Sequence, residues 1–178
     1  MSLPTSTEPD LLRIAAVVPP PGIDADQPVR EFVADLRARG IRVTGLLQDT
    51  REENDNCFVC LIDIETGTSY PILQCKTEAA SACALDTAAL IETTTVMRRI
   101  AGSAADLVVF NRFSGMEADG DGFAAEMLDF MSRDIPVLTI VRERHLPAWR
   151  HFTGGMACEL PPDLTALNAW FATIEHLA

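Results

Sequence analysis

A dense group of acidic residues follows one of the most apolar segments of the chain. Residues 105–110 have the pattern of a buried strand, and residues 111–122 then hold three carboxylates separated by glycines. Such a loop could hold a hard cation. In the calcium-hand spacing, however, Glu117 takes the first position and Leu128 takes the twelfth, where the bidentate acid belongs. The loop is therefore no calcium hand, and a solvated turn with Asp121 capping the next helix stays open beside a functional role.

A second group is basic. Residues 142–151 gather three arginines and two histidines in a chain whose formal net charge is −12. A basic group that opposes the overall charge often marks an anion-binding site, and we place Arg144 and His145 in such a site. The alternative is a salt-bridged face opposite the acidic loop. Trp149 and Phe152 are expected to be packing residues.

The third group lies where a nucleotide-binding α/β protein carries its phosphate loop. That loop needs glycines, whose N–H groups surround the phosphates, and a lysine that neutralises them. Here residues 19–21 are prolines without N–H groups, no lysine follows, and Asp24 and Asp26 stand where phosphate would lie. Gly22 is the glycine of this loop. The segment predicts weak triphosphate binding and by itself is typical of a rigid connector.

Other chemistry finds little support in the residues. Cys57 and Cys60 have the spacing of a zinc or redox pair, but they fall in a predicted strand, where positions three apart face opposite ways. No second pair completes four ligands. We therefore expect five reduced cysteines and no metal site. Neither a serine-hydrolase elbow nor a zinc-protease motif is present.

The elements that must position these groups follow from apolar patterning. Apolar blocks and alternating runs predict strands at residues 12–18, 41–47, 57–65, 69–73, 105–110, 136–141 and 156–160. Helical spacing predicts helices at residues 26–39, 86–101, 123–131 and 163–177, with a turn or short helix at 146–152. We expect Asp26 or Gln27, Asp86 and Asp163 to cap helices, and residues 49–56 to form a polar turn.

Apolar blocks of this kind belong to parallel strands covered on both faces by helices. The sequence therefore predicts an α/β fold, a three-layer α/β/α sandwich with a mainly parallel sheet and an antiparallel hairpin, residues 57–73, at one edge. We expect residues 11–178 to form a single domain and residues 1–10 to form a disordered or expression-derived tail. Ligands in such folds bind at the carboxyl ends of the strands, where all three groups lie.

Composition narrows the possible partners. The net charge of −12 and an aromatic content of 6% argue against nucleic acid. No apolar run approaches the ~18–20 residues of a membrane-spanning helix, so we expect no membrane insertion. The N-terminal residues lack the pattern of a secretory signal, and a cytoplasmic location is expected. A small anion, a nucleotide or a protein partner remains.

Residues 105–123, ADLVVFNRFSGMEADGDGF, resemble the signature of an uncharacterised bacterial family, a domain of unknown function often associated with molybdate ABC-transporter genes. That signature usually reads N-[KR]-F-G-K-x-E-A-x-G-x-G. Residues 81–86, 63–67 and 146–150 match as well, and the resemblance spans residues 14–171. It implies a link to molybdate uptake or molybdenum metabolism.

That family is in turn similar to the thermophile-type nucleoside triphosphatases of the P-loop class, which implies a P-loop NTPase-like fold. Gly115, Met116 and Glu117 resemble the end of their catalytic motif, so Glu117 would inherit the water-activating role. Asn111 stands at the magnesium-binding acid and Arg112 at the acid after it. These departures weigh against hydrolysis, since the charge on a transferring phosphoryl group would have little to balance it.

Three functions stay open. The first is a degenerate P-loop NTPase-like protein with a binding or regulatory role in molybdate uptake or molybdenum supply. The second is an active nucleoside-triphosphate hydrolase or transferase, which would use Mg²⁺, Glu117 as base and Arg112 or Arg144 as charge stabiliser. The third is an oxyanion-binding module for an anion such as molybdate or sulfate, which would use the arginine-rich segment 142–151 with Cys83 as an aid. The candidate binding residues are Gly22, Asn111, Arg112, Arg144 and His145.

Overall fold

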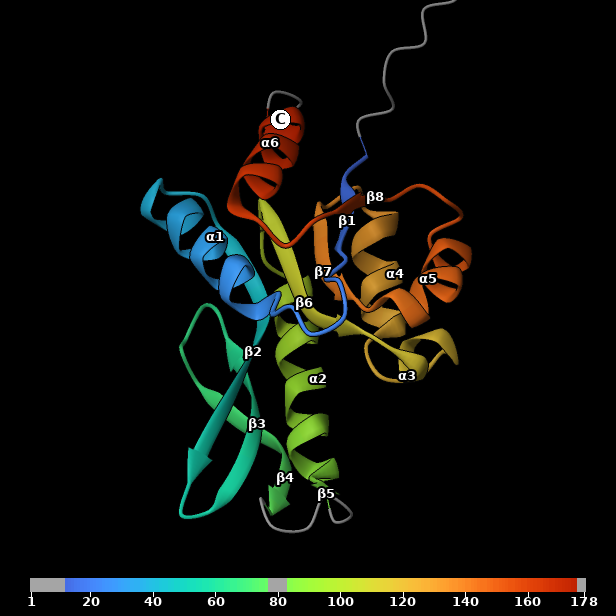
Figure 1. The fold of residues 1–178 in the computed structure, drawn as a ribbon. Coiled ribbons are helices and arrows are strands. Elements are labelled where there is room, and N and C mark those ends of the chain that lie inside the picture. Colours follow the sequence, from blue (N-terminus) through green and yellow to red (C-terminus); the bar gives the residue numbers. More distant parts are fainter. Residues whose placement is uncertain (1–11, 77–82, 176–178) are drawn as a thin grey trace, which may run out of the picture.

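The computed structural model describes residues 12–76 and 83–175 as a sheet covered by helices on both faces (Figure 1). The sheet has the order β5-β4-β3-β2-β6-β7-β1-β8. Its strands are β1 (Ile14–Val17), β2 (Val43–Glu53), β3 (Asn56–Asp63), β4 (Ser69–Lys76), β5 (Cys83–Leu85), β6 (Leu107–Phe113), β7 (Val137–Val141) and β8 (Cys158–Leu160). The helices are α1 (Asp26–Ala38), α2 (Thr87–Ala101), α3 (Gly115–Ala118), α4 (Ala124–Ser132), the short 3₁₀ turn η1 (Glu143–His145), α5 (Leu146–Phe152) and α6 (Leu164–Glu175).

Alternation along the central strands builds two cores, one on each face of the sheet. In β1, Ala15 and Val17 pack toward α1 and α6, whereas Ala16 belongs to the core under α2, α4 and α5. Strands β2, β6, β7, β1 and β8 pair in parallel, and the central strands β1, β6 and β7 are buried on both sides. The predicted three-layer α/β/α sandwich is confirmed.

The antiparallel part of the sheet is larger than the predicted hairpin. We expected a polar turn at residues 49–56, but β2 continues to Glu53 and pairs with β3 along its outer half. The turn is only Asn54 and Asp55, both with positive φ (51° and 60°), as a two-residue hairpin requires. β5 adds a further strand that the sequence pattern did not predict.

Helix caps agree with expectation at two positions and differ at two. Asp86 accepts hydrogen bonds from the first turn of α2, and Asp163 does so at α6. The predicted cap of α1 by Asp26 or Gln27 is wrong, because Ala25 is the N-cap residue and the carboxylate of Asp24, one residue earlier, accepts from Asp26 N and Gln27 N. The predicted cap of α4 by Asp121 is also wrong: Phe123 is the N-cap residue and no side chain caps it.

The carboxyl ends of β1, β6 and β7 lie at one edge of the sheet, since these neighbouring strands run parallel. The three segments singled out in the sequence therefore meet there (Figure 1). No helix within the described ranges is both long and apolar enough to cross a membrane. The predicted tail at residues 1–10 and the last residues of the predicted helix 163–177 lie outside the described residues.

Candidate functional site

The loop between β1 and α1, residues 18–25, begins with a tight turn. Ile23 N donates to Pro20 O at 3.1 Å, and Gly22 lies between them with a φ of 80°. Proline followed by a glycine of positive φ is the pattern of a type II turn. The prolines contribute no N–H group here, and Ile23 N is already bonded, so this part of the loop offers an anion few donors.

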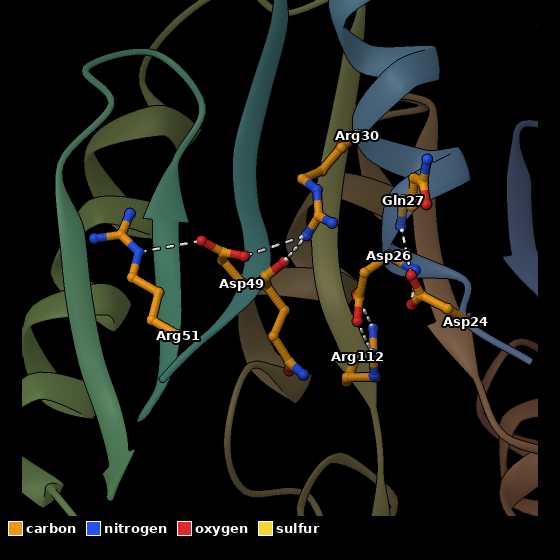
Figure 2. Close-up of polar contacts among 8 residues, drawn as sticks. Asp24, Asp26, Gln27, Arg30, Asp49, Arg51 and Arg112 are labelled. Carbon is orange, nitrogen blue, oxygen red and sulfur yellow. Dashed lines mark hydrogen bonds and ion pairs between the residues drawn. The ribbon is translucent and has the colours of Figure 1, made fainter. Parts of the chain in front are cut away.

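Asp24 occupies the N-terminus of α1. Its carboxylate accepts from Asp26 N at 2.9 Å and from Gln27 N at 3.3 Å (Figure 2). In nucleotide-binding α/β folds the N–H groups at this helix end bind phosphate. Here a carboxylate of the same chain takes two of these donors.

Asp26 forms an internal ion pair with Arg112 at this place. Its two oxygens accept from Arg112 Nη1 and Nη2, both at 2.7 Å, and both side chains are mostly buried (Figure 2). A bidentate pair of this kind holds the guanidinium in one orientation. Arg112 also donates to the backbone oxygen of Asn111, so its charge is directed inward and not toward a ligand.

Asn111 and Arg112 lie inside a strand, because β6 runs to Phe113 and not only to residue 110 as predicted. The register of β6 against β7 shifts between Phe110 and Phe113, which marks an irregularity at this strand end. Asn111 Nδ2 donates to Gln48 Oε1 at 3.3 Å.

On the other side of Gln48, α1 and β2 are linked by charged side chains. Arg30 donates to Gln48 O at 2.9 Å and lies 3.6 Å from Asp49, which also pairs with Arg51 (Figure 2). The charges on the β2 side of the site are therefore paired within the protein. Nothing in the sequence pattern indicated Gln48 or Arg30 as partners.

Glu117, the candidate base, is buried and holds local structure together. Its Oε2 accepts from Ser114 N at 2.9 Å and from Ser114 Oγ at 2.8 Å, and its Oε1 accepts from Phe123 N at 3.3 Å. This is a capping box at the start of α3. Gly122 has a φ of 57°, and a Cβ there would collide with Glu117 Oε1. The carboxylate thus fixes both ends of the loop.

A cavity opens between the β1–α1 loop and the segment after β7. It has a volume of about 530 Å³ and is lined by residues 19–23 and 142–144. We call it the β1–β7 cavity. Gly22 and Arg144, predicted as binding residues from segments 120 positions apart, line it together. His145 accepts from Arg144 Nε at 3.1 Å.

The arginines of this cavity stand apart from the others. Within residues 12–76 and 83–175, the side chain of every other arginine forms an ion pair with a carboxylate or donates to a backbone carbonyl. Neither Arg142 nor Arg144 has such a partner in that part of the chain. Arg150 bonds Glu159 of β8 at 2.7 and 2.8 Å. The expected alternative, a salt-bridged face opposite the acidic loop, is therefore not what the structure shows.

The residues do not fit a magnesium ion. Mg²⁺ requires near-octahedral oxygen ligands and usually binds one or two carboxylates. Both carboxylate oxygens of Asp26 accept hydrogen bonds from Arg112. Asn111 stands at the position where a metal-binding acid is expected. A void of about 10 Å³ beside these residues, lined also by buried Thr139, has room for about one water. Among the described residues, no cluster of three or more His, Cys, Asp or Glu could hold a metal.

The predicted site residues thus fall into three places. Gly22 and Arg144 line the β1–β7 cavity, and His145 is hydrogen-bonded to Arg144. Asn111 and Arg112 are hydrogen-bonded to side chains of β2 and α1. Glu117 belongs to the capping box of α3. Trp149 packs fully buried against the ring of Phe113, as expected of a packing residue. Cys57, Cys60 and Cys158 are free thiols.

The chain is similar in sequence to a known family and to a transport protein. The model of a family described as protein of unknown function, DUF2478, matches residues 14–170. The molybdenum import ATP-binding protein ModC 2 of Bradyrhizobium diazoefficiens is 34% identical over 166 residues, which make up 92% of this chain and 18% of that protein. The chain therefore spans about a fifth of the length of that relative.

The solution structure of a human cancer-related nucleoside triphosphatase superposes with a TM-score of 0.64, covering 92% of this chain and 96% of that one. The sequence identity is 13%, so the likeness concerns the fold. The expectation of a P-loop NTPase-like fold is confirmed.

Proposed function

The chain belongs to the DUF2478 family, as the motif at residues 105–123 indicated, and from the geometry of its site we propose that it is a non-hydrolysing accessory domain of molybdate import. In this role it binds or regulates without turning over a nucleotide. The fold is that of a P-loop NTPase, but the groups that would handle a triphosphate are engaged elsewhere or absent.

One observation carries the proposal. The carboxylate of Asp24 accepts hydrogen bonds from the N–H groups at the start of α1, and the carboxylate of Asp26 forms an ion pair with Arg112. A triphosphate at this place would have to displace one carboxylate and face the other. Without a loop lysine or a fitting Mg²⁺ site, the charge of a transferring phosphoryl group would remain unbalanced.

The molybdate link rests on similarity. The match to ModC 2 covers nearly all of this chain but a minor part of that protein. This similarity supports a link to molybdenum import. The family resemblance, to proteins often associated with molybdate ABC-transporter genes, supports the same link.

The absence of hydrolysis is tested by phosphate release from ATP and GTP in the presence of Mg²⁺. We expect the purified protein to release phosphate no faster than Glu117→Gln, and both to match the rate without protein. Turnover that disappears in Glu117→Gln, with the fold intact by circular dichroism, would overturn the proposal and favour the active hydrolase.

The molybdate link is tested in cells. We expect deletion of the gene to change molybdate uptake at limiting molybdate, and the wild-type gene to restore it. Sulfate uptake, measured in the same cells, serves as the control and should not change. Molybdate uptake that is identical with and without the chain would contradict the link.

A further inference from the structure

Two unpaired arginines border the β1–β7 cavity in a chain whose net charge is −12. Arg144 gives its Nε to His145, which leaves both Nη groups without a protein acceptor among the described residues. Arg142, two positions earlier, has no side-chain hydrogen bond within that part of the chain either. Guanidinium groups bind phosphate oxygens through strong, charge-assisted hydrogen bonds.

The size of the cavity indicates a ligand larger than an inorganic anion. Small-molecule sites typically measure about 300–1,000 Å³, and this one measures about 530 Å³. A tetrahedral oxyanion would leave most of that volume to water. The opposite wall consists of residues 19–21, all prolines, and Ile23, whose side chain is 56% exposed. These apolar surfaces suit a flat organic body.

Glu143 lies between the two arginines in sequence and also lines the cavity. A carboxylate there opposes the binding of a bare dianion, because like charges repel at short range. It can, however, accept hydrogen bonds from N–H or O–H groups of an organic ligand. The cavity lining therefore offers two guanidinium groups that can donate hydrogen bonds to an anion, one carboxylate acceptor and an apolar wall.

We propose that the β1–β7 cavity binds a phosphate monoester with a flat heterocyclic body, such as a mononucleotide or a flavin phosphate. The inference rests on the proposed function, because it takes the N-terminus of α1 as closed to phosphate by Asp24. The phosphate then binds at Arg142 and Arg144, and the ring lies against the prolines. No metal takes part.

The test is isothermal titration calorimetry with AMP and FMN as probes, in buffer containing EDTA. Adenosine supplies the ring without the charge, and inorganic phosphate and molybdate supply charge without the ring. We expect AMP or FMN to bind at least about tenfold more tightly than any of the three, since each fragment lacks one part of the recognition. The two probes distinguish a nucleotide from a flavin source.

Variants locate the binding. Arg144→Gln should weaken the better probe by roughly tenfold or more, through loss of a charge-assisted hydrogen bond. Arg142→Gln should act in the same direction. Arg150→Gln is the matched control, because Arg150 belongs to the same basic segment but pairs with Glu159 outside the cavity lining. It should leave the affinity unchanged.

Three results would overturn the inference. Molybdate or phosphate binding as tightly as AMP and FMN would indicate a bare oxyanion site. Equal losses in Arg144→Gln and Arg150→Gln would indicate a general charge effect. No binding of either organic phosphate would leave the cavity without this function. The proposed function fails separately, by nucleotide turnover in the phosphate-release assay, so the two failures are distinguishable.

Discussion

Asp24 does at residue scale what a bound phosphate does in related folds: it satisfies N–H groups at the start of a helix. The side chain is short, exposed and local to the loop, so its effect on the site is independent of distant packing. Substitution at this position therefore probes the site with little disturbance elsewhere.

Asp24→Ala should lower the free energy of unfolding by about 1 kcal/mol, the usual cost of losing a side-chain acceptor at a helix N-terminus. Sulfate should stabilise this variant more than the wild type, because the freed N–H groups of Asp26 and Gln27 can then take an anion. Urea unfolding with and without sulfate measures both effects. Asp35→Ala, an exposed acid of the same helix, controls for the change of charge. Equal sulfate responses in Asp24→Ala and wild type would contradict the role of Asp24.

Glu117→Gln should destabilise the protein by about 1–3 kcal/mol, because the amide group would place N–H against at least one buried donor. The present acceptor bonds come from Ser114 and Phe123. Urea denaturation gives the difference, and Asp119→Asn in the same acidic loop is the control. If the stability of Glu117→Gln matched that of wild type, Glu117 would be free for another role.

At this scale the sequence predicts residue types better than partners. Gly22 and Arg144 were predicted to bind, and they line one cavity. The pairing of Asp26 with Arg112 was not predictable, because 86 positions separate them and many acids could serve an arginine. Partner choice depends on the exact seating of α1 over the sheet, which local patterns do not encode.

At the scale of elements, β2 decides how the two parts of the sheet join. Residues 43–45 pair with β6 in parallel, and residues 46–53 pair with β3 in antiparallel register. Gly45 lies at the close approach to β6, with a φ of 119° and no room for a Cβ against the Val109 backbone. The glycine is therefore required for this strand to follow both neighbours.

Gly45→Ala should cost more than about 3 kcal/mol, since the clash is with backbone and cannot be relieved by rotating a side chain. Gly40→Ala distinguishes the cost of a positive φ from the cost of a steric clash with the neighbouring backbone. Gly40 also has a positive φ (83°) but open space around it, so its substitution should cost only about 1 kcal/mol. Thermal unfolding of both variants checks the comparison, and equal losses would contradict the packing argument.

Long apolar blocks made the parallel strands predictable, whereas the antiparallel arm was only partly predictable. The outer half of β2 is polar on both faces, so its residues looked like a turn. Its strand structure comes from pairing with β3 and not from propensity. The three residues of β5 are too few to form a pattern.

At the scale of the whole molecule, one ion pair ties the antiparallel arm to the helical layer. Asp63 at the end of β3 is 1% exposed and accepts from Arg99 of α2 at 2.6 Å. Burial alone would raise the pKa of this carboxyl, but hydrogen bonds from Thr66, Glu65 and Arg99 outweigh burial and lower the pKa. A lowered pKa makes the stability of the fold depend on pH.

Asp63→Asn should cost about 2 kcal/mol at neutral pH, the value of hydrogen bonds to a charged group. The ionised form is favoured by folding, so the contribution is complete above the unfolded pKa of about 4 and is lost as pH falls through the folded value. The difference between wild type and variant should therefore shrink below about pH 4. Urea unfolding from pH 7 to 3 tests it. A difference that stays constant to the lowest pH would contradict the assignment.

At the scale of the whole molecule, the charges that sum to −12 are unevenly distributed. Acids take part in capping and pairing around α1, while two arginines without acidic partners in the described chain border a cavity. The composition argued against nucleic acid as a partner but could not show this distribution of charges, because the distribution depends on which parallel strands are neighbours.

The response of two backbone amides to MgATP shows whether phosphate can reach the N-terminus of α1. Because the carboxylate of Asp24 occupies the N–H groups at the start of α1, the ¹H–¹⁵N resonances of Asp26 and Gln27 should stay in place up to millimolar MgATP in the wild-type protein. Saturable shifts of these two amides, at a concentration where ATP binds, would show that phosphate enters the α1 N-terminus and would contradict the account.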